Sequence, residues 1–175
     1  KDNIRWSLDW QDFTKSFFST IIRDHESEGV DFWWLDWQQY LTSPYTNSLS
    51  ETFWCNHVFF NEAQKRDNLR PVIFHRWGGR GSHRYQIGFS GDANISYEAL
   101  DFEPYFTATA SNVGYGYWGH DLGGHMYSND ELINNPNLVL RWIQFGVFTP
   151  IFRTHATADS RIERRIWKFP NFPTI

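Results

Sequence analysis

The spacing of apolar residues along the chain changes repeatedly between a helical and a strand-like period. Apolar residues three or four positions apart run from Trp10 to Ile21, and this spacing predicts a helix. Asp9 stands where an N-terminal cap is expected, and Gly29 stands where the helix is expected to close. The mostly apolar run 30–35 comes next and is typical of a buried strand.

The same alternation continues to the end of the chain. Helical patterns occupy about 50–63, 96–111 and 135–148, and strand-like runs occupy 71–75, 86–89, 114–118 and 151–153. Pro104 falls inside the second of these helices, where we expect a kink or a break. Strands that alternate with helices predict an α/β fold with a parallel sheet, either doubly wound or part of a (β/α)8 barrel.

Five ionisable residues lie at, or just past, the C-terminal end of a predicted strand: Asp36, Arg76, Asp92, Asp121 and His155. In parallel α/β architectures this edge of the sheet carries the active site. Scattered solvated charges would not be expected to recur at five successive strand ends. The pattern therefore predicts that these side chains form one site.

The chemistry of this site is indicated first by Asp36, which lies between Trp34 and Trp37. Indole faces stack on the C–H faces of sugars, and a carboxylate can attack or protonate an anomeric carbon. Asp92 is the second carboxylate, and in retaining glycosidases such a pair lies about 5–5.5 Å apart. Taken singly, Asp36 also fits an ordinary loop or capping residue, and Asp92 fits the cap of a helix beginning near Ile95.

The other strand-end residues are suited to hold a sugar. Arg76 can donate to hydroxyls and stabilise the charged form of a neighbouring carboxylate, and Asp121 and His155 can bind hydroxyls. Each also has a simpler interpretation: an ion pair for Arg76, an orienting role for Asp121, and an ordinary polar contact for His155. Trp118 is a further candidate stacking surface.

Composition narrows the class of protein. The chain has 175 residues with 10 Trp, 8 Tyr and 16 Phe, which fits either a bulky core or a carbohydrate cleft. A formal net charge of −4 without a basic run argues against nucleic-acid binding. No apolar run reaches the roughly 18 residues of a membrane helix. Cys55 is the single cysteine and excludes an internal disulfide, and the histidines are not spaced as a metal site.

Five segments resemble, in order, motifs of glycoside hydrolase family 31. They are Trp34-Leu35-Asp36-Trp37-Gln38-Gln39, Arg76 through Arg84-Tyr85, Phe89-Ser90-Gly91-Asp92-Ala93, Gly119-His120-Asp121-Leu122-Gly123-Gly124-His125, and 141–146 through Arg153-Thr154-His155. The family pattern has Met-Asn-Glu where this chain has 37–39. It has Trp at Phe89, Asn at Ala93 and Phe at His125.

The resemblance implies that residues 1–175 are the C-terminal part of a (β/α)8 catalytic barrel, about strands four to eight, cut from a longer protein. It implies Asp36 as nucleophile and Asp92 as acid/base. It also implies a set of residues that bind the substrate: Trp34, Trp37, Arg76, Phe89, Trp118, Asp121 and His155. We expect no cofactor and no metal, and we expect the isolated segment to be neither stable nor active.

The expected function is a retaining α-glycosidase that acts on terminal α-linked sugars. A transglycosylase with the same double displacement and a non-catalytic carbohydrate-binding protein are the alternatives. A doubly wound protein that binds a phosphorylated ligand is disfavoured, because Gly78-Gly79-Arg80-Gly81 lacks the spacing of a phosphate loop. The sugar, the oligomeric state and the compartment stay open.

Overall fold

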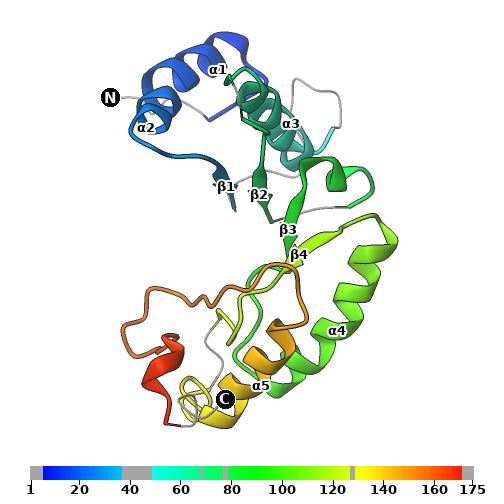
Figure 1. Cartoon of the computed structure of the whole chain (residues 1–175), viewed down its shortest axis with the longest axis vertical. Coiled ribbons are helices and arrows are strands. Elements are labelled where there is room, and N and C mark those ends of the chain that lie inside the picture. The colour runs from blue at the N-terminus through cyan, green and yellow to red at the C-terminus, as the bar shows by residue number, and fades with distance from the viewer. Residues whose placement is uncertain (1–5, 37–48, 68, 77–78, 127–128, 171–175) are drawn as a thin grey trace. The chain divides into compact units, whose positions relative to one another are not determined.

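The computed structural model describes residues 6–36, 49–67, 69–76, 79–126 and 129–170 (Figure 1). The chain forms two compact units, one made of residues 1–78 with 84–86 and the other of 79–83 with 87–175. Each unit contains one pair of parallel strands and the helix that connects them. In the part of the chain that the structure describes, no helix is long and apolar enough to cross a membrane.

The first unit contains the strands β1 (Trp33–Leu35) and β2 (Ile73–His75), connected by α3 (Glu51–Gln64). The strands are parallel and in register, with Trp33 opposite Ile73 and Leu35 opposite His75. Ahead of β1 lie α1 (Gln11–Phe17), a π-helical turn (Phe18–Ile22) and α2 (Arg23–Ser27). A core packs between these elements and consists of Leu8, Phe18, Ile22, Leu35, Cys55, Phe59 and Ile73.

The first helix differs from its prediction at its start and in its buried face. Asp9 does not cap it: the N-cap is Trp10, which makes no side-chain cap bond, and Asp9 accepts a hydrogen bond from the Ser7 hydroxyl instead. Trp10 and Ile21 are exposed, while Phe18 and Ile22 are buried. A π turn accommodates one extra residue and so moves the apolar stripe one position along the chain. Gly29 closes the helical region at a φ of 116°, as predicted.

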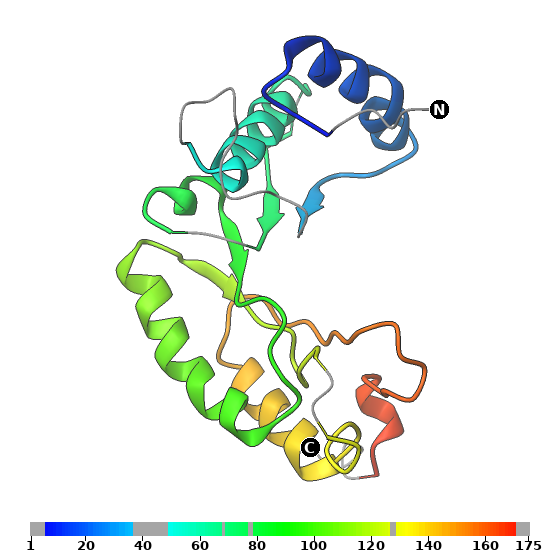
Figure 2. The same ribbon diagram turned by 180° about the vertical axis from the view of Figure 1, so that it is seen from behind.

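The second unit contains β3 (Ile87–Phe89), α4 (Tyr97–Asn112) and β4 (Tyr117–Gly119), followed by α5 (Pro136–Gly146) and a 3-10 turn (Ile166–Lys168). Another 3-10 turn, Ser82–Tyr85, precedes β3. Figure 2 shows α4 as the long connection between the two strands. Ile87 pairs with Tyr117 and Phe89 with Gly119, again in parallel.

Side-chain caps define the two long helices of this unit. Ser96 accepts from the amide of Ala99, and Asn135 accepts from the amides of Asn137 and Leu138. Pro104 does not break α4, which continues to Asn112. The bond lost at a mid-helix proline costs about 3 kcal/mol. The packing of the helix, including the buried Glu103 and Ala110, offsets that cost.

The last predicted strand, 151–153, is reduced to isolated bridges. Ile151 pairs with Gly119 and Thr154 pairs with Leu122, both in parallel. The segment therefore follows the direction of β4 without forming a continuous ladder. The two β–α–β units confirm the predicted α/β class with parallel strands.

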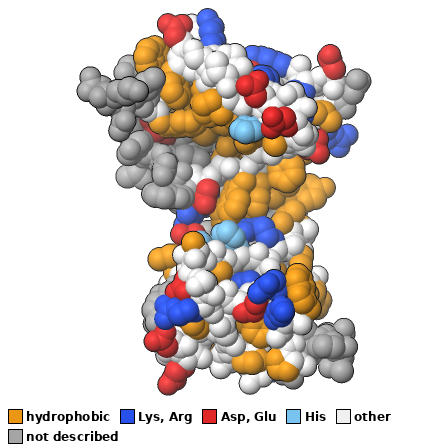
Figure 3. Space-filling view, turned by 90° about the vertical axis from the view of Figure 1, so that its left-hand side faces the viewer, with side chains coloured by type: hydrophobic (Ala, Val, Ile, Leu, Met, Phe, Trp, Pro, Cys, Tyr) orange, Lys and Arg blue, Asp and Glu red, His pale blue; other side chains and the backbone are white. Residues whose placement is uncertain are grey.

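Large apolar side chains are exposed on both units, and they appear as orange patches on the face shown in Figure 3. In the first unit they include Trp10, Ile21 and Phe32, and in the second Phe102, Tyr105, Phe148 and Trp167. Extended apolar surface of this kind is typical of protein that packs against further elements or partners.

Candidate active site

In the first unit, Asp36 and Arg76 directly follow two neighbouring parallel strands. β1 ends at Leu35 and β2 at His75, and these two residues are register partners. The next residue of each strand therefore emerges at the same edge, and Nη1 of Arg76 lies 3.1 Å from Oδ1 of Asp36. Both side chains are partly buried. The sequence prediction that strand ends bring these two residues together is confirmed within this unit.

The alternation of side chains along β1 places its two indoles on opposite faces. Trp33 packs against the core, and its Nε1 donates to Oε1 of Glu26 at 3.1 Å. Trp34 is 39% exposed and stacks on Phe74, with 5.7 Å between ring centroids. An exposed indole two residues before Asp36 provides an apolar wall next to the carboxylate. Trp37 lies outside the described residues.

In the second unit, Asp92 lies in the loop after β3, and the chain after β4 runs beside that loop. The amides of His125 and Met126 both donate to the carbonyl of Ala93, at 2.8 and 2.9 Å. This backbone pairing places Nε2 of His125 3.8 Å from Oδ1 of Asp92. The alternative interpretation of Asp92 as a helix cap is wrong, because Ser96 caps α4.

Asp121 is the most buried of the predicted site residues, with no exposed surface. Its Oδ1 forms an ion pair with Nη2 of Arg153, and its Oδ2 lies 3.8 Å from Nδ1 of His125. Burial raises the pKa of Asp121 to about 6, an effect larger than the lowering by Arg153. The guanidinium of Arg153 also lies over the ring of Phe89, 5.1 Å from its centroid. The orienting partner of Asp121 is thus Arg153, to which the sequence analysis assigned no role.

His155 meets His125 although the two are distant in the sequence. Their rings stack with 5.0 Å between centroids and an interplanar angle of 21°. One ligand atom from each of Asp121, His125 and His155 lies within 4.8 Å of the others, a grouping that could hold a metal ion. The strand ends predicted that Asp121 and His155 lie in one site, whereas His125 joins them through the loop after β4, which no sequence pattern indicated.

Two of the aromatic residues predicted to bind the substrate are not open to a ligand in this structure. Phe89 is 1% exposed and lies beneath Arg153. Trp118 is 5% exposed and packs with Ala110, Tyr115 and Phe106 in a core cluster. Both rings support the strand ends from within the unit.

His120, the residue after β4, belongs to a buried polar network. Its Nδ1 lies 2.9 Å from both Oγ of Ser90 and Oε2 of Glu103, and its Nε2 lies 3.0 Å from Oγ1 of Thr107. These contacts tie β4 to α4 and to the loop after β3. They provide polar partners for the buried side chains of Glu103 and His120.

A buried arginine fixes the two glycines between Asp121 and His125. Nη2 of Arg164 donates to the carbonyls of Gly123 and Gly124, at 2.8 and 3.2 Å, and Nη1 donates to the carbonyl of Ile133 at 3.0 Å. Both glycines adopt positive φ, 100° and 80°, which side chains rarely tolerate. Arg164 therefore holds the turn that sets the separation of Asp121 and His125.

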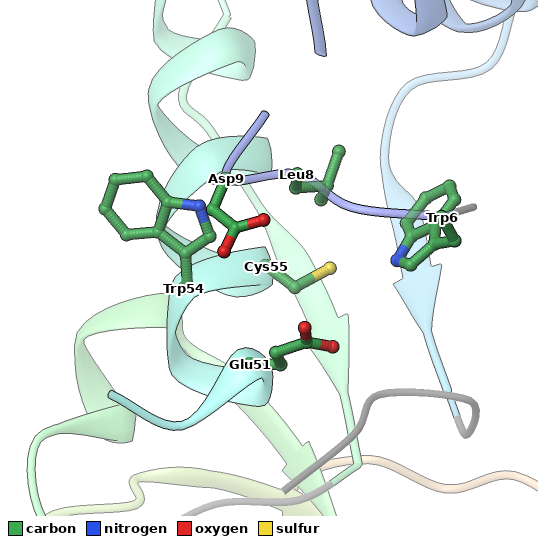
Figure 4. Close-up of a pocket in the computed structure, with 6 residues that line it drawn as sticks. All are labelled: Trp6, Leu8, Asp9, Glu51, Trp54 and Cys55. Carbon is green, nitrogen blue, oxygen red and sulfur yellow. The ribbon is translucent and has the colours of Figure 1, made fainter. Parts of the chain in front are cut away.

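Two hollows lie away from these residues. The first is a cavity of about 10 Å³ in the first unit, at the lower limit for one water molecule and lined by Trp6, Leu8, Asp9, Glu51, Trp54 and Cys55 (Figure 4). The second is a groove of about 590 Å³ along α4 and α5, lined by Tyr97, Glu98, Leu100, Asp101, Pro104, Arg141 and Phe145. Among the residues that the structure describes, no predicted site residue lines either of them.

Comparison with known proteins then decides between the two parallel-sheet architectures. Residues 5–175 match the sequence model of the glycosyl hydrolases family 31 TIM-barrel domain. The chain belongs to this family. The fold is therefore part of a (β/α)8 barrel, as the resemblance implied.

Curated relatives in the family are named for several sugars. The chain is 34% identical over 100 residues to a probable glucan 1,3-alpha-glucosidase of Oryza sativa, which covers 57% of this chain and 10% of that protein. It is 32% identical over 111 residues to an alpha-xylosidase of Saccharolobus solfataricus, covering 62% and 15%. It is 27% identical over 157 residues to a sulfoquinovosidase of Escherichia coli, covering 80% and 23%. The chain thus spans less than a quarter of each of these relatives.

Solved structures show the same fold at lower identity. An alpha-xylosidase of Xanthomonas citri matches with a TM-score of 0.71 and 22% identity, over 86% of this chain and 20% of that one. A dextranase of Flavobacterium johnsoniae complexed with isomaltotriose matches with a TM-score of 0.73 and 21% identity, over 92% and 22%.

Proposed function

We propose that the protein containing this chain is a retaining α-glycosidase that removes terminal α-linked sugars. Asp36 is the nucleophile and Asp92 is the general acid and then the general base. The observation that carries the proposal is the ion pair between Asp36 and Arg76 at the ends of two parallel strands, in a chain that belongs to family 31. Relatives named as glucosidases, a xylosidase and a sulfoquinovosidase support the reaction class.

The reaction follows from the two carboxylates. The Asp36 carboxylate attacks the anomeric carbon and forms a glycosyl ester, while Asp92 gives its proton to the leaving oxygen. The Asp92 carboxylate then takes a proton from water, and the resulting nucleophile attacks the same carbon and releases Asp36. Arg76 contacts Oδ1 of Asp36 and holds the carboxylate in a fixed orientation for the attack.

Sugar binding is assigned to three of the predicted side chains. Trp34 provides an exposed apolar face beside Asp36. Asp121 and His155 bind hydroxyl groups, with Arg153 fixing the orientation of Asp121. Buried carboxylates that are held by a guanidinium keep a defined geometry, and such preorganisation favours discrimination among sugar epimers.

The experiment is a panel of aryl α-glycosides (glucoside, xyloside, galactoside, N-acetylgalactosaminide and sulfoquinovoside), assayed with the full-length protein. Asp36→Ala is the test variant and Asp31→Ala is its matched control, because Asp31 lies exposed in the same segment before β1. We expect turnover of at least one glycoside that is lost in Asp36→Ala and kept in Asp31→Ala. Sugar binding without turnover of any glycoside would instead identify a non-catalytic carbohydrate-binding protein.

The same panel separates hydrolysis from transfer. Products formed in the presence of added sugar acceptors are free sugar for a hydrolase and new disaccharide for a transglycosylase. Both enzymes share the glycosyl ester on Asp36, so the assignment of the nucleophile does not depend on this outcome.

A further inference from the structure

Three side chains of the second unit converge beside Asp92. Nδ1 of His125 lies 3.8 Å from Oδ2 of Asp121, and the ring of His155 stacks on that of His125. The ligand atoms of the three side chains all lie within 4.8 Å of one another. Asp121 and His125 belong to one loop after β4, whereas His155 comes from the segment that pairs with that loop at Leu122 and Thr154.

We propose that Asp121, His125 and His155 bind one divalent transition-metal ion of the zinc class, and that this ion inhibits the enzyme reversibly. Two imidazoles and one carboxylate form a donor set that Zn²⁺ and Co²⁺ accept. Mg²⁺ and Ca²⁺ prefer oxygen ligands, so a site with two imidazole nitrogens should bind them weakly. Three protein ligands leave one coordination position open to water or to a sugar hydroxyl.

The distances suit such an ion after a small movement. Metal–ligand bonds of about 2.0–2.1 Å allow two ligand atoms to lie up to about 4 Å apart. Nδ1 of His125 and Oδ2 of Asp121, at 3.8 Å, already meet this limit. The remaining separations, at most 4.8 Å, need to close by less than about 1 Å, which side-chain rotation supplies.

The surroundings of two donor atoms, one from Asp121 and one from His125, favour the binding of a cation. Oδ2 of Asp121 and Nδ1 of His125 are both buried and have no hydrogen-bond partner among the described residues. Buried polar atoms of this kind are costly unless something satisfies them. Arg153 occupies Oδ1 of Asp121, so Oδ2 is the carboxylate oxygen that faces Nδ1 of His125.

The inhibitory effect follows from the second nitrogen of His125. Nε2 lies 3.8 Å from Oδ1 of Asp92, and a metal-bound histidine nearly always donates its other N–H to a carboxylate, a backbone carbonyl or water. A bound ion would therefore draw Asp92 onto His125 and withdraw Asp121 and His155 from the sugar. This inhibitory step rests on the proposed function, whereas the binding of the metal does not.

The site depends on a residue that sets this chain apart from the family motif that it resembles. His125 stands where the Gly-His-Asp-Ile-Gly-Gly-Phe motif has Phe. Without this imidazole one histidine and one carboxylate remain, which is too few protein ligands for a typical zinc site. His125→Phe is thus a variant that the fold is expected to tolerate and that removes the site.

The test measures metal binding and activity separately, on the full-length protein after dialysis against a chelator. Co²⁺ is titrated while visible absorption is recorded, and Zn²⁺ binding is measured by calorimetry. His125→Phe and His155→Gln are compared with His25→Phe, because His25 is exposed on α2 and distant in sequence from the site. Thermal unfolding verifies that each variant is folded.

We expect one equivalent of Co²⁺ with visible bands in the wild type and in His25→Phe, and binding at least about 10-fold weaker in both site variants. Zn²⁺ should compete with the aryl glycoside in the wild type but not in His125→Phe. Mg²⁺ should neither bind at the site nor compete with the glycoside. Equal Co²⁺ binding by the wild type and His125→Phe would overturn the metal site. If Zn²⁺ binds but does not compete with the glycoside, the inhibitory role is overturned. If the protein binds Co²⁺ but has no glycosidase activity, the proposed function alone is rejected.

Discussion

Arg76 and Asp36 form an ion pair at the ends of β2 and β1, with 3.1 Å between Nη1 and Oδ1. The pair follows from the register of the strands, which places Leu35 opposite His75. The amide of Arg76 also donates to the carbonyl of Leu35, at 3.2 Å, and this bond extends the ladder by one residue. The orientation of the Asp36 side chain is thus coupled to the backbone of the neighbouring strand.

Replacement of Arg76 tests this coupling. A hydrogen bond to a charged group contributes about 1.5–3 kcal/mol, so Arg76→Met should lower kcat/KM by about 10- to 150-fold. Arg66→Met is the matched control, because Arg66 also pairs with a carboxylate in this unit but contacts Glu26 and the Asp31 carbonyl ahead of β1. If kcat/KM is unchanged in Arg76→Met, or falls equally in Arg66→Met, Arg76 has no specific role in the reaction.

The role of Asp92 predicts a dependence on the leaving group. Asp92→Ala should lower turnover of glycosides with poor leaving groups by about 10²–10⁴-fold, and should affect activated aryl glycosides less in the first step. Added azide should restore turnover and yield a glycosyl azide of retained configuration, because azide needs no general base. Asp101→Ala, on the exposed side of α4, should behave as the wild type. Equal losses for all leaving groups without azide rescue would contradict the assignment.

The strand ends could be predicted from the sequence because they depend on local patterns. Strand-like runs locate β1 and β2, and the residue that directly follows each run is Asp36 or Arg76. The buried face of the first helix could not be predicted, because the π turn at Phe18–Ile22 breaks the period on which the pattern relies. Pro104 was expected to kink or break α4, but tertiary packing maintains the helix.

Arg164 is predicted to hold the turn between Asp121 and His125. Arg164→Met leaves the carbonyls of Gly123, Gly124 and Ile133 without their buried donor, at a cost of about 1–3 kcal/mol each, reduced where water can enter. Hydrogen exchange measured by mass spectrometry should therefore accelerate in the peptide that spans 121–126. Arg161→Met is the control, since Arg161 is largely exposed. The same exchange rates in both variants would show that Arg164 does not order the turn.

Cys55 is predicted to be unreactive in the native protein. Burial, with a smaller contribution from Glu51, raises the pKa of its thiol to about 12. The thiolate that reacts with alkylating agents is therefore scarce at pH 8, and it should stay scarce up to about pH 10 as long as the fold is intact. Iodoacetamide followed by peptide mapping should label the Cys55 peptide only after denaturation. Rapid labelling of the native protein at pH 8 would contradict the burial of this side chain.

The strand ends predicted that Asp92, Asp121 and His155 lie together, but the place of His125 among them could not be predicted. His125 follows the end of β4 by six residues, and only the pairing of its backbone with Ala93 shows that it meets the other three. Arg153 was missed because it was counted as part of the predicted strand 151–153, a segment that the structure reduces to isolated bridges. Periodicity identifies elements and their ends, whereas contacts between loops depend on the tertiary fold.

Trapping of the glycosyl ester tests whether Asp36 is the nucleophile of a retaining glycosidase. The full-length protein is incubated with an activated 5-fluoro glycoside of the sugar that the panel identifies, and its proteolytic peptides are mapped by mass spectrometry. We expect one sugar-bearing peptide, with the ester on Asp36, and no such peptide from Asp36→Ala. An ester on another carboxylate, or turnover with inversion at the anomeric carbon, would contradict this role of Asp36.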